Sequence, residues 1–247
     1  MPDQISLVQL AYASIPLIIV LVILHFWKAN AFTGVYATVR MLGQLFLIGF
    51  VLTQIFTTNE AWLVLLVVTV MCLIAAWISL RTTPKLRIRL YPFALGAVVL
   101  GGGVVLATIV FGVLQLEPWF MPRYVIPLAG MIFSSSMNAI SLAADRYFSD
   151  RKSGIDSKAS RSKALETALI PATNGMFAVG LVSIPGMMTG QVLSGVSPFI
   201  AARYQIMVMM MLFSATGLSA AIFLAFCQQS VVERILCRQE DVDQTTE

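Results

Sequence analysis

The chain has 247 residues, of which 58% are hydrophobic and only 11% are charged, and its mean hydropathy is +0.86. Soluble domains contain about 45–50% apolar and about 25% charged residues, so the composition excludes an ordinary water-soluble fold. The formal charge of +4 does not indicate a nucleic-acid partner, because basic residues that border apolar segments usually set membrane topology. The sequence therefore predicts an integral membrane protein.

Seven apolar segments are each long enough to cross a bilayer as a helix, which requires about 20 mostly apolar residues. They are Leu7 to Trp27, Val35 to Phe56, Ala61 to Leu80, Pro92 to Leu116, Pro122 to Ala144, Ala168 to Leu193 and Ala202 to Gln228. We expect an all-α, polytopic fold with about seven transmembrane helices. Six is the alternative, because Pro and Gly in the fifth and sixth segments could break them.

The predicted spans form one membrane domain over residues 1–238, with a cytoplasmic loop at 145–166 and a disordered, polar tail at 239–247. With seven spans, fourteen of the sixteen Lys and Arg residues fall on one side, and only Arg123 and Arg203 fall on the other. Cytoplasmic loops carry the excess of basic residues. We therefore expect the N-terminus outside and the C-terminus in the cytoplasm.

Two predicted spans carry conspicuous polar side chains. In the second, Arg40 and Gln44 are four residues apart and share a helix face; they line a pathway, or Arg40 extends to the headgroups while Gln44 bonds a neighbouring helix. In the fifth, Ser134 to Ser136 and Asn138 follow Gly130. Small hydroxyl residues permit close helix packing, so this run is either a packing surface or a polar stripe along a pathway.

The sixth segment has the least ordinary sequence, with Pro185 and Gly186 near its middle and the polar residues Ser183, Thr189 and Gln191 around them. A Pro-Gly pair frees backbone groups, which within a bilayer are tolerated only where protein or water satisfies them. Broken helices of this kind often form transport sites or gates. A kink packed against neighbouring helices is the alternative.

The residue types needed for catalysis or hard-metal binding are scarce. No Asp or Glu falls securely inside a predicted span, so neither a carboxylate proton relay nor a hard-cation site is indicated. The thirteen methionines, including Met209 to Met211, fit either a soft-metal site or packing, and metal ligands stay unassigned. The only histidine is His25, and common hydrolase and nucleotide-binding motifs are absent. We therefore predict a non-enzymatic protein without a cofactor.

The most distinctive stretch of the chain is Val179-Gly-Leu-Val-Ser-Ile-Pro-Gly-Met-Met-Thr-Gly-Gln191, followed by Gly195-Val-Ser-Pro198 and Arg203-Tyr-Gln-Ile-Met207. Further stretches are Val125-Ile-Pro-Leu-Ala-Gly-Met-Ile132, Ala168-Leu-Ile-Pro171, the Arg40 to Gln44 pattern and Gly49-Phe-Val-Leu52. Over about residues 35–228 the chain resembles the FetB-type iron-export ABC transporter permeases, a family that also includes plant aluminium-sensitivity membrane proteins.

This resemblance implies a multi-pass permease of the bacterial inner membrane that pairs with a separate cytoplasmic ATP-binding subunit and exports iron or another metal. We expect a pair of permease chains to work by alternating access with a pair of ATPases. The residues expected to form the pathway or gate are Arg40, Gln44, Asn138, Ser183, Pro185, Gly186, Met187, Met188, Thr189 and Gln191.

One segment departs from the family pattern. Family members carry a longer stretch between the fifth and sixth spans, with a Leu-Gly-Ala element that resembles the coupling segment of other ABC permeases. Residues 145–166 are shorter and lack it. They form either a solvated, mobile loop or a reduced coupling helix over Lys158 to Glu166, in which Arg161 and Lys163 face the ATPase.

Two other functional classes compete with the permease hypothesis. An ATPase-independent carrier or channel is favoured by the shortened segment. An intramembrane protease or transferase would need a nucleophile and a base, and His25 is its best candidate base.

Overall fold

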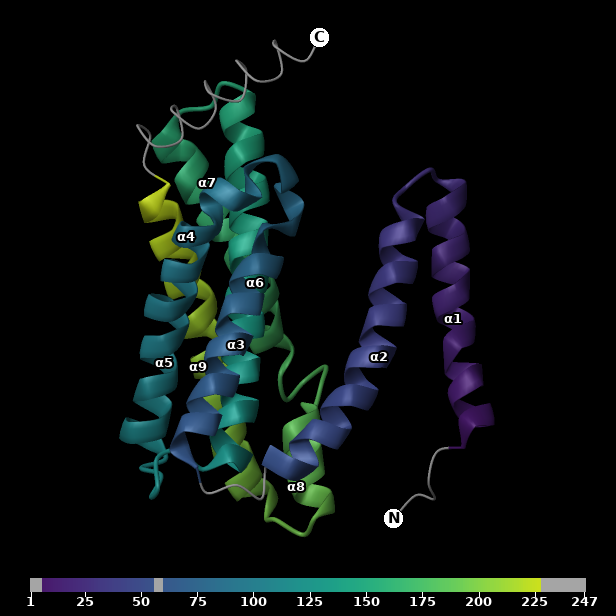
Figure 1. Cartoon of the computed structure of the whole chain (residues 1–247), viewed down its shortest axis with the longest axis vertical. Helices are drawn as coiled ribbons and strands as arrows, with labels where there is room; N and C mark the ends of the chain where they lie inside the picture. The colour runs from purple at the N-terminus through teal and green to yellow at the C-terminus, as the bar shows by residue number, and fades with distance from the viewer. Residues whose placement is uncertain (1–5, 56–59, 228–247) are drawn as a thin grey trace. The chain divides into compact units, whose positions relative to one another are not determined.

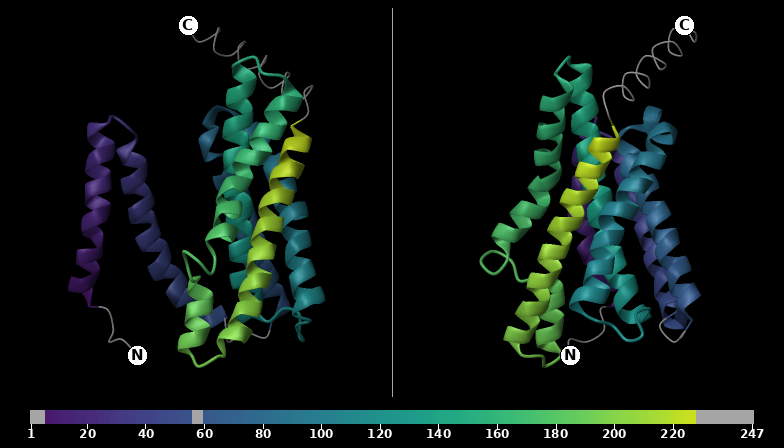
Figure 2. Two further views of the ribbon diagram at one scale, coloured as in Figure 1. Left: turned by 180° about the vertical axis from the view of Figure 1, so that it is seen from behind. Right: turned by 90° about the vertical axis from the view of Figure 1, so that its left-hand side faces the viewer.

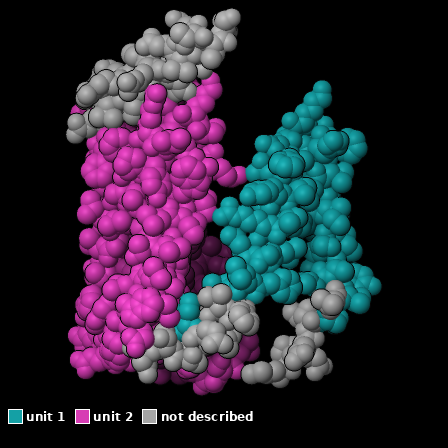
Figure 3. All heavy atoms as spheres, in the orientation of Figure 1, with its two compact units in different colours: residues 1–58 teal, residues 59–247 magenta. Residues whose placement is uncertain are grey.

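A computed structural model describes residues 6–55 and 60–227 of the chain. They belong to two compact units, residues 1–58 and residues 59–247 (Figure 3). The tail expected at 239–247 lies outside the described residues. The described residues are helical throughout, apart from turns, short connections and one isolated β-bridge.

Unit 1 is a helical hairpin of α1 (Leu7–Phe26) and α2 (Ala31–Ile55) (Figure 1). Ser6 begins α1 with a capping box, in which its side chain accepts a hydrogen bond from the Gln9 amide. At Gly34 of α2, an added Cβ would lie 2.7 Å from a methyl carbon of Leu21. This glycine therefore permits the two helices to approach closely.

Unit 2 begins with α3 (Ala61–Ser79), which is followed by two short 3₁₀ turns, η1 (Leu80–Thr82) and η2 (Pro84–Leu86). We call residues 80–86 the elbow. The elbow leads into one long helical rod. In chain order the rod consists of α4 (Arg87–Ala97), the π-helical turn η3 (Val98–Gly102), α5 (Gly103–Ala107) and the π-helical turn η4 (Thr108–Val113).

The centre of unit 2 is α6 (Pro122–Lys152), which packs against α3, α7 (Ser157–Ala178) and α9 (Pro198–Phe226). Proline in the fifth predicted span does not break it: α6 runs continuously through Pro127 for 31 residues. The buried core consists mainly of small and aliphatic side chains from α3, α4, α6 and α9. Small side chains let membrane helices approach closely.

Residues 145–166, for which a cytoplasmic loop is predicted, contain the end of α6, a turn and the start of α7. Residues up to Lys152 belong to α6, and α7 starts at Ser157. Asp156 caps α7 by accepting hydrogen bonds from the amides of its first turn. Ser160 and Ala164 are fully buried, so packing holds this highly charged segment in a helix. Of the two alternatives for the segment, the helical one is present.

The sixth predicted span is broken. It is divided between α7, which ends at Ala178, and α8 (Gly186–Leu193). Figure 2 shows α7 ending in a loop part-way along the bundle, with α8 beyond that loop beside the first turns of α9. In the described part of the chain, six helices are long and apolar enough to cross a membrane, and neither α7 nor α8 is among them.

Candidate functional site

The connection between α7 and α8, residues 179–185, forms a compact loop that we call the break. Gly180 has a φ of +82°, a backbone conformation that glycine adopts without strain. Its amide donates to the Ser183 carbonyl oxygen at 2.9 Å, and the Ser183 amide donates to the Ala178 carbonyl oxygen at 3.1 Å. Pro185 then precedes α8 in an extended conformation. The hydrogen bonds recorded for these backbone groups are local to the break and its flanking helices.

A cavity of about 450 Å³, which we call the methionine cavity, lies beside the break. Its lining comes from α7, the break, α8 and α9, and includes Pro185 and Met188. Gln205 is the only residue with a polar side chain in that lining; it is 6% exposed, and its Oε1 atom has no hydrogen-bond partner in the described structure. The wall of this apolar cavity therefore includes one buried hydrogen-bond acceptor, the Gln205 Oε1 atom, without a donor in the described structure.

A second cavity of about 230 Å³, the central cavity, lies between α6, α7 and α9. Its polar lining residues are Ser135, Asn138 and Thr216, and Pro171 and Gly175 of α7 border it. Met209 lines both the central and the methionine cavities. The two cavities therefore share one thioether side chain in their linings, and the central cavity carries more polar groups than the methionine cavity.

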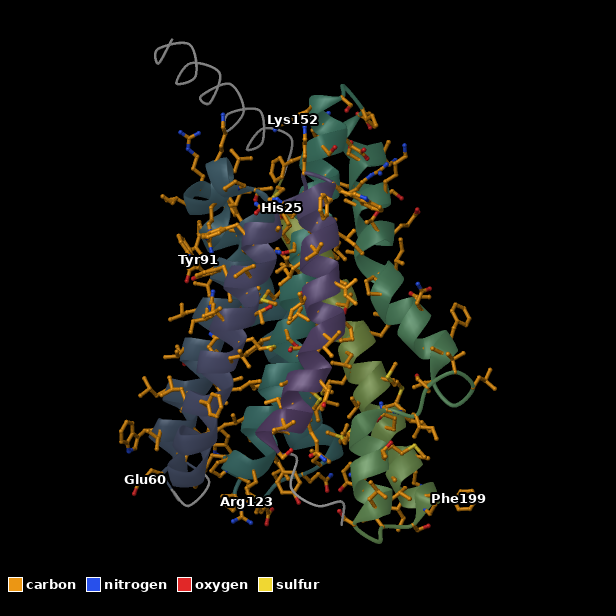
Figure 4. The ribbon with its side chains drawn as sticks, turned by 90° about the vertical axis from the view of Figure 1, so that its right-hand side faces the viewer. His25, Glu60, Tyr91, Arg123, Lys152 and Phe199 are labelled. Carbon is orange, nitrogen blue, oxygen red and sulfur yellow. The ribbon has the colours of Figure 1, made fainter. Side chains whose placement is uncertain are left out.

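A third cavity, of about 190 Å³, is the Arg123 cavity. Its lining includes Arg123, Met187, Gln191 and Tyr204. The Oε1 atom of Gln191 is buried without a hydrogen-bond partner in the described structure. Figure 4 shows Arg123 at the end of unit 2 opposite Lys152. The two faces of α8 thus serve different cavities, because Met187 and Gln191 line this one while Met188 lines the methionine cavity.

The predicted pathway residues separate into groups. Asn138, Pro185, Met188, Met187 and Gln191 line the three cavities just described. The other predicted pathway residues at or next to the break are exposed and line none of these cavities: Ser183, Gly186 and Thr189. Arg40 and Gln44 are exposed on α2 in unit 1, so their place in a pathway stays a prediction.

Sequence reasoning missed Gln205 and Met209 as lining residues. The detectable signal was one amide side chain in the otherwise apolar sequence that follows Tyr204. The role of Met209 could not be identified in that way, because the cavities it borders combine helices that are far apart along the chain.

The predicted coupling residues Arg161, Lys163 and Glu166 are all exposed on the first half of α7. The start of that helix is held firmly. The buried Tyr147 hydroxyl lies 3.1 Å from Ser157 Oγ and donates to the Cys227 carbonyl oxygen at 3.2 Å. One phenol therefore joins α6, α7 and the end of α9.

The elbow is also braced. Arg87 donates two hydrogen bonds to the Trp77 carbonyl oxygen, at 3.0 and 2.7 Å, and its guanidinium lies 3.8 Å from the centre of the Trp77 ring. Ser141 of α6 donates to the Ser79 carbonyl oxygen at 2.5 Å. The elbow and the end of α6 together line a groove of about 400 Å³ that includes Lys85, Asp145 and Lys152.

The part of the chain that the structure describes contains neither a metal site built from His, Cys, Asp or Glu side chains nor a nucleophile–base pair around His25. Residues 6–55 and 60–227 contain no group of three or more His, Cys, Asp or Glu side chains that could hold a metal ion. The His25 side chain is exposed on α1 and makes a ring contact with Phe26. No hydrogen bond from its imidazole to a nucleophile is recorded among these residues.

Comparison with known proteins identifies the family. A model of the uncharacterised protein family UPF0014 matches residues 7–232. The chain belongs to the UPF0014 family. It is 34% identical to the probable iron export permease protein FetB of Escherichia coli over 198 residues, which cover 74% of this chain and 75% of FetB. No solved structure matches the chain.

Other UPF0014 relatives come from cyanobacteria and plants. A UPF0014 membrane protein of Synechocystis is 34% identical over 216 residues, covering 78% of this chain and 81% of the relative. Protein ALUMINUM SENSITIVE 3 of Arabidopsis thaliana is 28% identical over 238 residues, covering 88% and 85%. These relatives confirm the family resemblance. Together with the long apolar helices of the structure, they confirm a multi-pass membrane protein.

Proposed function

We propose that this UPF0014 protein is the permease subunit of an ABC-type exporter for a metal ion, and that the break between α7 and α8 is its gate. The observation that carries the proposal is the position of the break: it borders the methionine cavity, which shares the lining residue Met209 with the central cavity. Membership in the family of a protein named as a probable iron export permease supports transport of a metal.

A gate at the break is favoured by how weakly this segment is held. Its hydrogen bonds are local, and the side chains of Leu181, Val182 and Ile184 are 90%, 84% and 69% exposed. Segments with few packed contacts open at low free-energy cost. The break can therefore change conformation without disturbing the core of α3, α6 and α9.

We propose that α7 connects this gate to ATP hydrolysis. The helix carries the exposed Arg161, Lys163 and Glu166 near its start and reaches the break at its end. Its 22 residues correspond to a rod of about 33 Å. A separate ATPase that contacts the start of α7 would thus move the break, and a pair of permease chains would give one such contact to each of two ATPases.

The orientation proposed for this mechanism places the α6–α7 turn in the cytoplasm. The elbow and this turn carry many basic residues, and Lys85 and Lys152 line the same groove. Arg123 lies at the opposite end (Figure 4). The basic end of a membrane protein is usually cytoplasmic. In this arrangement α7 and α8 together make the sixth of seven crossings, with the N-terminus outside and the C-terminus inside.

Two glycine substitutions test the gate. Ala at position 180 would be forced to a φ near +82°, which costs about 1–2 kcal/mol for a residue with a Cβ. Gly190 of α8 has no heavy atom within 4 Å of an added Cβ, and its φ is not positive. We expect Gly180→Ala to slow metal transport severalfold in proteoliposomes that also contain the ATPase and ATP, and Gly190→Ala to transport like the wild type. Equal rates for all three proteins would refute a gate at the break.

Charge reversal tests the contact between α7 and the ATPase more cleanly than deletion of the start of α7. A deletion would also remove Ser160, which is fully buried, and would disturb the packing of the helix. The tagged chain would be purified in mild detergent, and ATP hydrolysis by copurifying chains would be measured with and without ferrous iron. We expect Arg161→Glu with Lys163→Glu to abolish copurification of the ATPase. The control is Arg203→Glu, a charge reversal at an exposed residue of α9. Metal transport by a purified chain without any ATPase would favour a carrier instead.

A further inference from the structure

The methionine cavity has an unusual set of side chains for a space in a membrane protein. Four methionines line it, Met176 from α7, Met188 from α8 and Met209 and Met210 from α9. The other lining residues are aliphatic or proline and glycine, apart from Gln205. Thioether groups from three helices therefore surround one volume of about 450 Å³.

Gln205 is the one lining residue of this cavity with a polar side chain. The residue is 6% exposed, and its Oε1 atom is buried in the cavity wall with no donor among the described residues. A buried carbonyl oxygen without a donor is destabilising. A positive charge in the cavity would be attracted to this oxygen through the cavity wall and would reduce the penalty.

The lining chemistry selects among possible cations. Thioether sulfur is a soft ligand that favours Cu(I), whereas Mg²⁺, Ca²⁺ and Mn²⁺ favour carboxylates, carbonyls and water. All ligands in this cavity are neutral. The cost of moving an ion out of water rises with the square of its charge, so an uncharged site in a low-dielectric region disfavours divalent ions most strongly.

We propose that the methionine cavity binds a soft monovalent metal ion of the Cu(I) and Ag(I) class. The sulfur atoms of Met176, Met188 and Met209 are its ligands, and the negative end of the Gln205 amide dipole stabilises its charge. This inference deepens the proposed function by naming the substrate class. It rests on that function for the claim that the bound ion is transported, but binding can be measured separately.

The position of Met209 suggests how the ion reaches the methionine cavity. The central cavity provides hydroxyl and amide groups from Ser135, Asn138 and Thr216, which can hold a partly hydrated ion. Met209 borders both cavities. An ion that moves past it therefore exchanges water for thioether sulfur next to the break, where a change in conformation would release it.

The test measures Ag(I) binding to the purified full-length chain by titration calorimetry in chloride-free detergent buffer, followed by the variant Met176→Leu, Met188→Leu, Met209→Leu. Leucine keeps the volume of methionine and removes the sulfur, so the fold is preserved. The matched control is Met131→Leu, Met137→Leu, Met207→Leu, which changes three partly buried methionines outside this cavity.

We expect the wild type to bind one Ag(I) tightly and the cavity variant to lose at least about tenfold in affinity, the lower limit seen when a group that supports a metal ligand is removed. The control should bind like the wild type. Equal losses in both variants would overturn the proposal, because silver would then bind methionines generally. A copurifying lipid that only the cavity variant loses, together with no tight Ag(I) site, would also overturn it.

Transport separates the two hypotheses. If the cavity variant loses Ag(I) binding while wild-type proteoliposomes that also contain the ATPase and ATP transport neither Ag(I) nor ferrous iron, the binding site is supported and the proposed function fails. If the wild type transports metal but the cavity variant keeps its Ag(I) affinity, the permease function is supported and the methionine site fails.

Discussion

The crossing of η3 and α9 gives the sharpest prediction about stability. An added Cβ at Gly101 would lie 2.6 Å from Ser219 Oγ, 2.7 Å from Ser219 N and 2.8 Å from Ser219 Cα. Two of these atoms belong to the backbone of α9 and cannot rotate away. Ser219 is fully buried and donates to Ser136 Oγ at 2.9 Å. Gly101→Ala must therefore separate the helices and disturb this hydrogen bond.

The magnitude follows from two contributions. Overpacking of a well-packed core costs about 1–3 kcal/mol, and a hydrogen bond between membrane helices contributes about 0.6 kcal/mol on average. The control is Gly103→Ala, two residues later, where an added Cβ meets nothing within 4 Å. Both variants gain the same helix propensity, about 1 kcal/mol. We therefore expect Gly101→Ala to be less stable than Gly103→Ala by about 2–4 kcal/mol.

Thermal unfolding of both purified variants in one detergent, at one scan rate, measures this difference. A change of 1 kcal/mol shifts the midpoint of a protein of this size by about 2–4 °C, so the midpoints should differ by about 4–16 °C. Ser219→Ala isolates the contribution of the hydrogen bond and should lower the midpoint less than Gly101→Ala does. Equal midpoints for the Gly101 and Gly103 variants would show that the helices do not cross as described.

Two further substitutions test the contacts that hold the α6–α7 hairpin and the elbow. Tyr147→Phe removes the buried hydroxyl that contacts Ser157 Oγ, and we expect it to destabilise the protein by about 1–3 kcal/mol, seen as a lower unfolding midpoint; an unchanged midpoint would contradict the contact. Arg87→Lys loses the planar group that donates twice to the Trp77 carbonyl oxygen and lies over its ring. We expect a loss of about 1 kcal/mol and altered tryptophan fluorescence, whereas Arg87→Gln should be at least as destabilising.

Hydropathy was sufficient to predict the all-helical fold and most of the long helices. Each long apolar segment has few ways to satisfy its backbone inside a bilayer, and a helix is the simplest. The break was also predictable near Pro185, because proline cannot donate a backbone hydrogen bond. Pro127 carries the same residue type but lies within the continuous helix α6. Composition alone does not distinguish these two positions.

The charged segment at 145–166 shows how charge can mask a helical pattern in a sequence. Its many basic and hydroxyl residues suggested a solvated loop as one of two alternatives. The small residues Ser157, Ser160, Ala164 and Ala168 are nevertheless spaced three or four apart, and all are buried on one face of α7. This helical spacing of small residues was the available sequence signal for a helix at this position. The signal is weak, because serine and alanine are common in loops as well.

The methionine cavity could not be predicted because its side chains come from distant parts of the chain. Met176 and Met209 are 33 residues apart, by subtraction of their positions, and they line one cavity only because α7 packs against α9. No periodicity connects residues on different helices. Methionine also packs into irregular gaps in ordinary cores, so its abundance alone does not identify a site.

The two ends of α7 differ in how firmly they are held, and this difference determines which end changes conformation more easily. At its start, the buried Tyr147 hydroxyl contacts Ser157 and donates to the carbonyl oxygen of Cys227. At its end, the break relies on local backbone bonds between Gly180, Ser183 and Ala178. Because the break has few packed contacts, it changes conformation at a lower free-energy cost than the firmly held start of α7. A gate that opens at the far end of α7 therefore requires no deformation of the core helices.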